Sequence, residues 1–159
     1  MIKTAFLADH PEVIPTLAEW FRAQWPDYYA EQTLSDIAED FREDAQYHSI
    51  PLRLVAFVDG DLAGTIVLRD WVTDTLPDAH PGLGGLFVPV LYRQRGVATE
   101  LVRAGMKVAR EQGYEVVYAT TVVAGGILKR LGWVVVKEIM HDDEQLTLYR
   151  CDLTDKGTR

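Results

Sequence analysis

The chain has 159 residues, of which 48% are hydrophobic and 25% charged, and its net charge is −8. This length and composition predict one globular domain with a sizeable core. The acidic balance argues against a nucleic-acid partner, whose phosphates it would repel. A local loop of free backbone amides could still bind a phosphorylated cofactor.

The cysteine count and the hydropathy further limit the classes of protein to which the chain could belong. Cys151 is the single cysteine, so an intramolecular disulfide and a cysteine-based metal site are both excluded, and we expect no metal. Asp9 interrupts the N-terminal segment Ile2 to Ala8, which therefore lacks the pattern of a signal peptide. No apolar run approaches the roughly 18 residues of a membrane span. We expect a cytoplasmic protein with no membrane partner.

The first part of the chain predicts one strand and two helices. The strand covers Ile2 to Leu7. Asp9 is a candidate cap for the helix that follows, and Pro15 favours a regular helix that begins near that residue. The segment Thr33-Leu34-Ser35-Asp36 resembles a capping box and predicts the start of the second helix.

Three strands are then predicted. The apolar, β-branched runs Leu52 to Val58 and Ala63 to Leu68 flank Asp59-Gly60-Asp61, which is typical of a hairpin turn. A loop from Asp70 to Pro81 leads to a strand over Leu83 to Val88.

The last part predicts a helix, a strand, a short helix and two strands, over Val97 to Gln112, Glu115 to Thr121, Ile127 to Leu131, Trp133 to Glu138 and Gln145 to Arg150. The order is β-α-α-β-β-β-α-β-α-β-β. A helix joins the strands at 83–88 and 115–121, so we expect these two to be parallel. One domain is expected over residues 1–153, with a flexible tail at 154–159.

A basic turn precedes the helix at Val97 and is the most informative segment. Its sequence is Arg93-Gln94-Arg95-Gly96-Val97-Ala98-Thr99. Free amides in the first turn of a helix and the helix dipole favour an anion, and Gly96 leaves room for a phosphate near the backbone. Taken alone, this pattern is weak, and a solvated basic turn is the alternative interpretation.

The surrounding sequence resembles the GNAT superfamily of N-acetyltransferases over nearly its whole length. Arg93-x-x-Gly96-x-Ala98 matches the pyrophosphate loop of that family and follows the strand end Leu86-Phe87-Val88-Pro89. The next helix ends at Gly113-Tyr114, and Leu128-Lys129-Arg130-Leu131-Gly132-Trp133 resembles the family's Tyr-x-x-x-Gly-Phe segment. The order of the elements also fits.

The resemblance implies a fold and a cofactor. The fold is a mixed α/β (α+β) GNAT-like one. Its mostly antiparallel sheet has about seven strands, about four helices flank it, and it splays between the strands at 83–88 and 115–121. Acetyl-CoA would lie in that cleft, with its pantetheine arm along the backbone of Leu86, Phe87 and Val88. Its pyrophosphate would bind the amides of Arg93, Gln94, Arg95, Gly96, Val97, Ala98 and Thr99.

The implied activity is acetyl transfer to a primary amine of a small molecule or a peptide, by direct attack without an acyl-enzyme. Leu128 occupies the position of the family's usual general acid, a tyrosine, and cannot donate a proton. Two hypotheses follow. Either the protein is an active enzyme without that acid, or it is a non-catalytic acyl-CoA-binding or regulatory module. Cys151 is expected in the core.

Other candidate residues come from the loops and from the strand opposite the cleft. Many relatives carry a glutamate base on the strand before the phosphate loop, but 83–88 has no acid. His80 and Tyr118 are weak candidates for proton transfer; a solvated loop histidine and a packing tyrosine are the alternatives. On the acceptor side, a cationic amine could meet the residues Trp25, Tyr28, Tyr29, Trp71 and Asp74.

Two further points stay open. Gly125-Gly126 stands where relatives begin their last cleft helix, and it provides either loop flexibility or a close approach to the cofactor. The sequence also allows a homodimer.

Overall fold

The computed structural model describes residues 1–73, 76–121, 124–141 and 143–154. Its elements are β1 (Ile2–Phe6), α1 (Ile14–Gln24), α2 (Leu34–Glu43), β2 (Leu52–Val58), β3 (Asp61–Arg69), β4 (Gly82–Phe87), α3 (Val97–Glu111), β5 (Val116–Thr121), α4 (Gly125–Arg130), β6 (Val134–His141) and β7 (Glu144–Asp152). The predicted order is confirmed. Several bounds differ, and α4 begins at Gly125 rather than at the expected Ile127.

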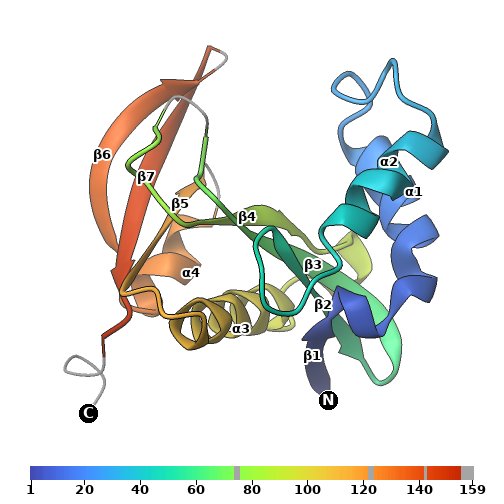
Figure 1. The fold of residues 1–159 in the computed structure, drawn as a ribbon, viewed down its shortest axis with the longest axis horizontal. Coiled ribbons are helices and arrows are strands. Elements are labelled where there is room, and N and C mark those ends of the chain that lie inside the picture. The colour runs from blue at the N-terminus through green and yellow to red at the C-terminus, as the bar shows by residue number, and fades with distance from the viewer. Residues whose placement is uncertain (74–75, 122–123, 142, 155–159) are drawn as a thin grey trace.

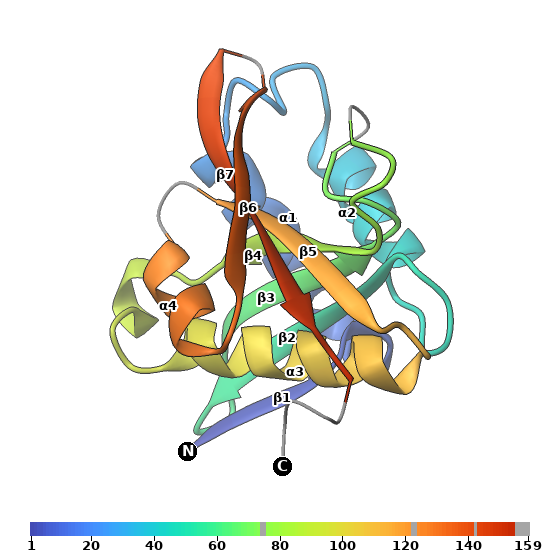
Figure 2. The same ribbon diagram turned by 90° about the vertical axis from the view of Figure 1, so that its left-hand side faces the viewer.

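The strands form one seven-stranded sheet in the order β1-β2-β3-β4-β5-β7-β6 (Figure 1). All neighbours are antiparallel except β4 and β5, which are parallel as predicted. Helix α3 crosses one face of the sheet, as Figure 2 shows. Helices α1 and α2 lie apart from α3, over the N-terminal half of the sheet. No helix in the described ranges is both long and apolar enough to cross a membrane.

Local chemistry explains two of the predicted features. Asp59 and Gly60 take positive φ angles, 51° and 90°, and Val58 pairs with Asp61, so the β2–β3 turn has two residues. At the start of α2, the Asp36 amide donates to the Thr33 hydroxyl at 3.0 Å. The Thr33 amide donates to the Asp36 carboxylate at 3.1 Å, which completes a capping box.

The predicted cap at Asp9 is wrong. Two short 3-10 turns, Leu7–Asp9 and Pro11–Val13, follow β1, and no side chain caps either turn or α1. Helix α1 begins at Ile14, so Pro15 falls in its first turn, where a missing N–H costs no helical bond. The Asp9 carboxylate instead accepts a hydrogen bond from the Tyr47 hydroxyl at 2.6 Å.

Two apolar clusters fill the two faces of the sheet. Helix α3 contributes the buried residues Val97, Leu101, Val102, Val108 and Ala109 to the larger cluster. On α3, a Cβ at Gly105 would lie 2.6 Å from Cδ1 of Leu83, so the glycine lets the helix approach β4 closely. The smaller cluster joins α1 and α2 to Val55 of β2. The cleft strand β4 is thus supported by packing from both faces.

Candidate active site

A bulge bends β4 at Gly84 and Gly85. Val67 of β3 pairs with Gly84 and Thr65 pairs with Phe87, so β4 holds one residue more than β3 between these pairs. Gly85 has a φ of +60°, a left-handed conformation that glycine adopts without strain. The bend turns the end of β4 away from its neighbour β5.

A cavity opens where β4 and β5 separate. Their one described bridge joins Gly82 to Tyr118, which confirms the predicted splay. The cavity has a volume of about 250 Å³. Its lining consists of Trp25, Ile66, Leu83, Gly84, Gly85, Leu86, Val102, Ala119, Thr120, Thr121, Ala124 and Leu128. None of these has an acidic or basic side chain, so the described lining is apolar apart from threonine hydroxyls, the indole N–H of Trp25 and backbone.

The basic turn before α3 presents a row of free amides. Gln94 and Gly96 have φ angles of +60° and +86°. No described backbone carbonyl accepts from the amides of Gln94 to Thr99, and the first helical bond runs from the Glu100 amide to the Gly96 carbonyl at 3.0 Å. Successive amides around left-handed residues form an anion-binding concavity. A Cβ at Gly96 would meet only Cδ1 of Ile2, at 3.8 Å, so the space is open. The turn therefore fits a pyrophosphate.

The two arginines of this turn are held in place differently. Nε of Arg93 donates to the Val88 carbonyl at 2.7 Å, which ties the turn to the end of β4. The Arg95 guanidinium lies 5.4 Å from the centre of the Tyr92 ring. Both residues are exposed and lie beside the free amides. The turn is thus electropositive in an acidic protein.

The far end of the cavity is formed by α4. Leu128 is 3% exposed and lines the cavity, so no hydroxyl group is present at that position. A Cβ at Gly125 would overlap the Tyr149 hydroxyl of β7, whereas a Cβ at Gly126 would meet only Nη1 of Arg130, at 3.4 Å. Neither sequence-based interpretation of the glycine pair identified this contact. Gly125 makes room for a tyrosine that is 24 residues away in the sequence.

The glycine pair gives a matched test. Gly125→Ala is expected to lower the free energy of unfolding by about 1–3 kcal/mol, because the new methyl group meets a buried hydroxyl. Gly126→Ala is expected to raise it by roughly 0.5–1 kcal/mol, because alanine favours a helix over glycine. Urea unfolding measures both. Adding Tyr149→Phe to Gly125→Ala should recover part of the loss, and a stabilising Gly125→Ala variant would contradict this contact.

A buried arginine lies on the other face of β2, beside α2. Arg53 is 6% exposed; its Nε donates to Oδ2 of Asp44 and its Nη1 to the Thr65 hydroxyl, both at 3.2 Å. Its guanidinium lies 4.7 Å from the centre of the Phe41 ring. Burial lowers the pKa of Arg53 to about 10, although Asp44 opposes this change. Burial also raises the pKa of Asp44.

The sequence did not reveal Arg53 as a site residue. Its only signal is a charged residue at an inward-facing position of the otherwise apolar run Leu52 to Val58.

The predicted acceptor residues separate in space. Trp25 lines the cavity, and its ring lies 6.0 Å from that of Phe87. Tyr28 is exposed and Tyr29 is half-buried, and their rings meet edge-on at 4.8 Å. Burial raises the pKa of Tyr29. Trp71 is 41% exposed and is not part of the cavity lining. Asp74 lies outside the described residues.

The predicted proton-transfer candidates do not line the cavity either. Nδ1 of His80 lies 2.6 Å from the Asp70 carbonyl oxygen, and its ring meets that of Tyr114 edge-on. Tyr118 lines a separate hollow of about 310 Å³ with Asp78 and Lys137. Cys151 is buried, and burial raises its pKa, which suits a core thiol rather than a nucleophile.

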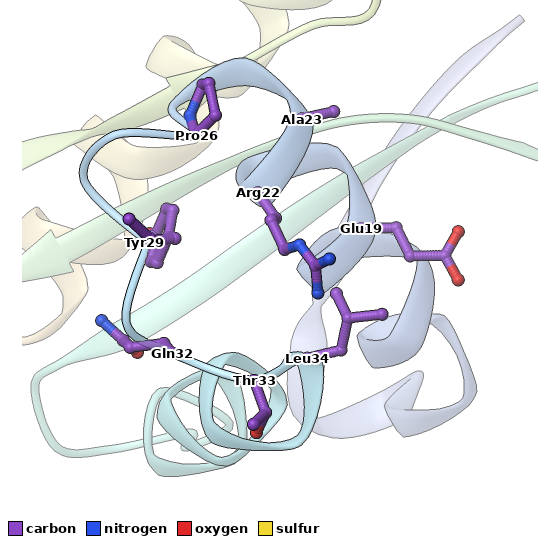
Figure 3. A pocket seen from close by; sticks show the side chains of 9 residues that line it. Glu19, Arg22, Ala23, Pro26, Tyr29, Gln32, Thr33 and Leu34 are labelled. Carbon is purple, nitrogen blue, oxygen red and sulfur yellow. The ribbon is translucent and has the colours of Figure 1, made fainter.

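Another hollow, of about 660 Å³, lies between α1 and the loop that follows it (Figure 3). Glu19, Arg22, Pro26, Tyr29 and Leu34 are among its lining residues. None of the phosphate-turn residues, and none of the residues that line the cavity between β4 and β5, belongs to it. We therefore place the candidate site at the smaller cavity. Within the described ranges, no group of three or more His, Cys, Asp or Glu side chains could hold a metal ion.

The comparisons with known proteins agree with this geometry. The model of the acetyltransferase (GNAT) family matches residues 14–131. The chain therefore belongs to the GNAT acetyltransferase family, as the resemblance predicted, and the activity of this family is acetyl transfer. No curated protein matches the chain.

Solved structures share the fold at low sequence identity. An aminoglycoside 6'-N-acetyltransferase complexed with coenzyme A is 16% identical, with a TM-score of 0.75 over 97% of each chain. The acetyltransferase yncA from Salmonella typhimurium, solved with its cofactor acetyl-CoA, is 14% identical, with a TM-score of 0.72 over 97% of this chain and 95% of that one. An N-acetyltransferase from Staphylococcus aureus Mu50 is 15% identical, with a TM-score of 0.72 over 97% and 98%.

Proposed function

We propose that the protein is an acetyl-CoA-dependent N-acetyltransferase whose acceptor is a primary amine of a small molecule or a peptide. The observation that carries this proposal is the row of free amides from Gln94 to Thr99 at the mouth of the splayed cleft. With Arg93, these amides would hold the pyrophosphate. The β4 edge from Leu86 to Val88 would pair with the pantetheine arm. The named relatives bound to acetyl-CoA or coenzyme A support this assignment.

Bound acetyl-CoA would supply its acetyl group as a thioester. The amine nitrogen would form a bond to the carbonyl carbon, the carbon–sulfur bond would break, and the nitrogen would lose a proton. A thiol has a pKa of about 8.5, so its thiolate is a tolerable leaving group without a protein acid. Leu128 and the other apolar lining residues would exclude water and hold the reactants in position.

This arrangement predicts the pH dependence of the reaction. The described cavity lining contains no base, so the amine would react from its free form. We expect kcat/KM to rise about tenfold per pH unit until the pKa of the amine is reached, near 10.4 for a lysine-like amine. A profile that levels off near pH 6.5 would instead indicate a histidine base such as His80. Initial rates from pH 6 to 10, with protein stability checked at each pH, distinguish these outcomes.

A panel of amines incubated with acetyl-CoA tests the function itself, with acetylated products detected by mass spectrometry. Turnover of any amine supports the proposal. Stoichiometric acetyl-CoA binding without turnover would favour the non-catalytic module, for which Leu128 is the specific observation. In that case Leu128→Tyr should gain activity that the parent protein lacks.

We also propose a cellular compartment and an oligomeric state. The free, buried thiol of Cys151 suits a reducing compartment such as the cytoplasm. The exposed apolar residues Val134, Val135 and Met140 on the edge strand β6 support a homodimer, which sedimentation would test.

A further inference from the structure

Two guanidinium groups converge on the bulge of β4. Nη2 of Arg69 lies 2.6 Å from the position that a Cβ would occupy at Gly84. At Gly85 the corresponding position lies 3.3 Å from Nη2 of Arg53 and 3.5 Å from Nη2 of Arg69. Since both distances share one point, the two Nη2 atoms are no more than 6.8 Å apart, the sum of 3.3 and 3.5 Å. Gly84 and Gly85 also line the cleft cavity.

The hydrogen bonds within the protein leave some N–H donors of these two guanidinium groups unused. Nε and Nη1 of Arg53 are bonded to Asp44 and Thr65, while its Nη2 faces the bulge. Within residues 1–73, 76–121, 124–141 and 143–154, no side chain forms a hydrogen bond or an ion pair with Arg69. Arg69 is exposed, yet desolvation of its guanidinium lowers its pKa. Neither guanidinium lines the cavity itself, but both approach the two glycines that do.

The charge count favours one monovalent anion. Arg53 and Arg69 carry two positive charges, and Asp44 offsets one of them. The bulge has no side chain of its own between the guanidiniums, because both of its residues are glycines. Two arginine forks that approach the same bulge match the planar geometry of a carboxylate. A dianionic phosphate would exceed the local positive charge, in a protein whose net charge is already −8.

We propose that Arg53 and Arg69 bind a carboxylate of the acceptor, so that the substrate carries an amine and a carboxylate a few bonds apart, as an amino acid does. This inference rests on the proposed acetyltransferase function and specifies its substrate class. The carboxylate would lie against Gly84 and Gly85, and the same residues border the cavity in which the amine must meet the thioester. Because Gly84 and Gly85 border both places, a small amino acid fits this arrangement better than a long polyamine.

Arg69→Gln is the test variant, because Arg69 is exposed and its replacement should leave the protein folded. The acceptors are leucine, phenylalanine, glutamate and β-alanine, each paired with its carboxamide. Peptide amides that begin with Asp or Asn have no free α-carboxylate. Comparing the two shows whether the site binds a side-chain carboxylate or requires a free α-carboxylate. Arg103→Gln on the outer face of α3 is the matched control, since it also removes one exposed arginine.

The parent is expected to prefer an amino acid over its carboxamide by at least about tenfold in kcat/KM. In Arg69→Gln, the KM for the amino acid should rise roughly 10- to 100-fold, the usual cost of losing a charge-assisted hydrogen bond. The KM for the carboxamide should rise less than that for the amino acid, because a neutral amide oxygen accepts a weaker hydrogen bond. The affinity for acetyl-CoA should change less than about twofold, as should every value in Arg103→Gln. Arg69→Lys should restore part of the preference.

Equal use of amino acids and carboxamides by the parent would overturn the carboxylate site while leaving the acetyltransferase function intact. So would an unchanged preference in Arg69→Gln. If no amine is acetylated, calorimetric titration of the coenzyme A-loaded protein with the same amino acids tests the carboxylate site independently of catalysis. Binding that Arg69→Gln abolishes would support the site although the transferase proposal fails, and the absence of binding would overturn both.

Discussion

Gly96→Glu is expected to abolish the stabilisation of the protein by acetyl-CoA. In the parent, acetyl-CoA at 100 times its dissociation constant should add about 2.7 kcal/mol to the free energy of unfolding. The glutamate would place a carboxylate among the free amides that are assigned to the pyrophosphate, and affinity should fall by more than about 100-fold. Thermal unfolding with and without acetyl-CoA measures the effect.

Gly113→Glu is the matched control for this variant. Gly113 follows the other end of α3 with a φ of +96°, close to the +86° of Gly96, and a Cβ there meets no atom within 4 Å. Each glutamate should therefore cost about 1–2 kcal/mol of backbone strain. Only Gly96→Glu should lose the response to acetyl-CoA. An equal response in both variants would remove the turn from the binding site.

Arg53→Met is expected to lower the free energy of unfolding by about 3 kcal/mol at pH 7, because Asp44 is left charged in a largely buried position without its partner. For a chain of this length, that loss corresponds to a fall in Tm of roughly 6–12 °C. Burial already raises the pKa of Asp44 above its unfolded value, and removing Arg53 should raise it further. The deficit should therefore shrink as the pH falls through that raised pKa and the carboxyl group becomes neutral.

The double variant Arg53→Met/Asp44→Leu should recover most of the lost stability, because it removes the stranded charge. Arg42→Met is the control: Arg42 forms an exposed pair with Glu39 at 2.8 Å, and its loss should change the free energy of unfolding by less than about 0.5 kcal/mol. Equal effects of Arg53→Met and Arg42→Met would show that the buried pair contributes no more than a surface pair.

Elements whose cause is local could be predicted from the sequence. The Asp59-Gly60 turn, the Thr33 capping box and the free turn before α3 each depend on a few adjacent residues, so the sequence displays their whole cause. The prediction of Asp9 as a cap failed because the local pattern competed with a tertiary contact. Tyr47, 38 residues away, occupies that carboxylate.

The proposed carboxylate site could not be predicted, because its parts come from separate elements. Arg53, Arg69 and Asp44 meet only after β2, β3 and α2 pack together, and each is an ordinary charged residue in the sequence. The bulge at Gly85 depends on the register of β3, which a strand pattern does not reveal. The aromatic residues were predicted on the acceptor side because of their residue type. Among the described ones, only Trp25 lines the cavity.

The single bridge between β4 and β5 has a consequence for how the protein can change in evolution. Among the described residues, no ladder of hydrogen bonds fixes the width of the gap beyond Gly82 and Tyr118. The side chains of Leu83, Val102 and Leu128 line the cavity in this gap. Exchanging one of these side chains for a smaller one would widen the gap without unpairing a strand. Tolerance for longer acyl chains can therefore be acquired through single substitutions, while the architecture stays unchanged.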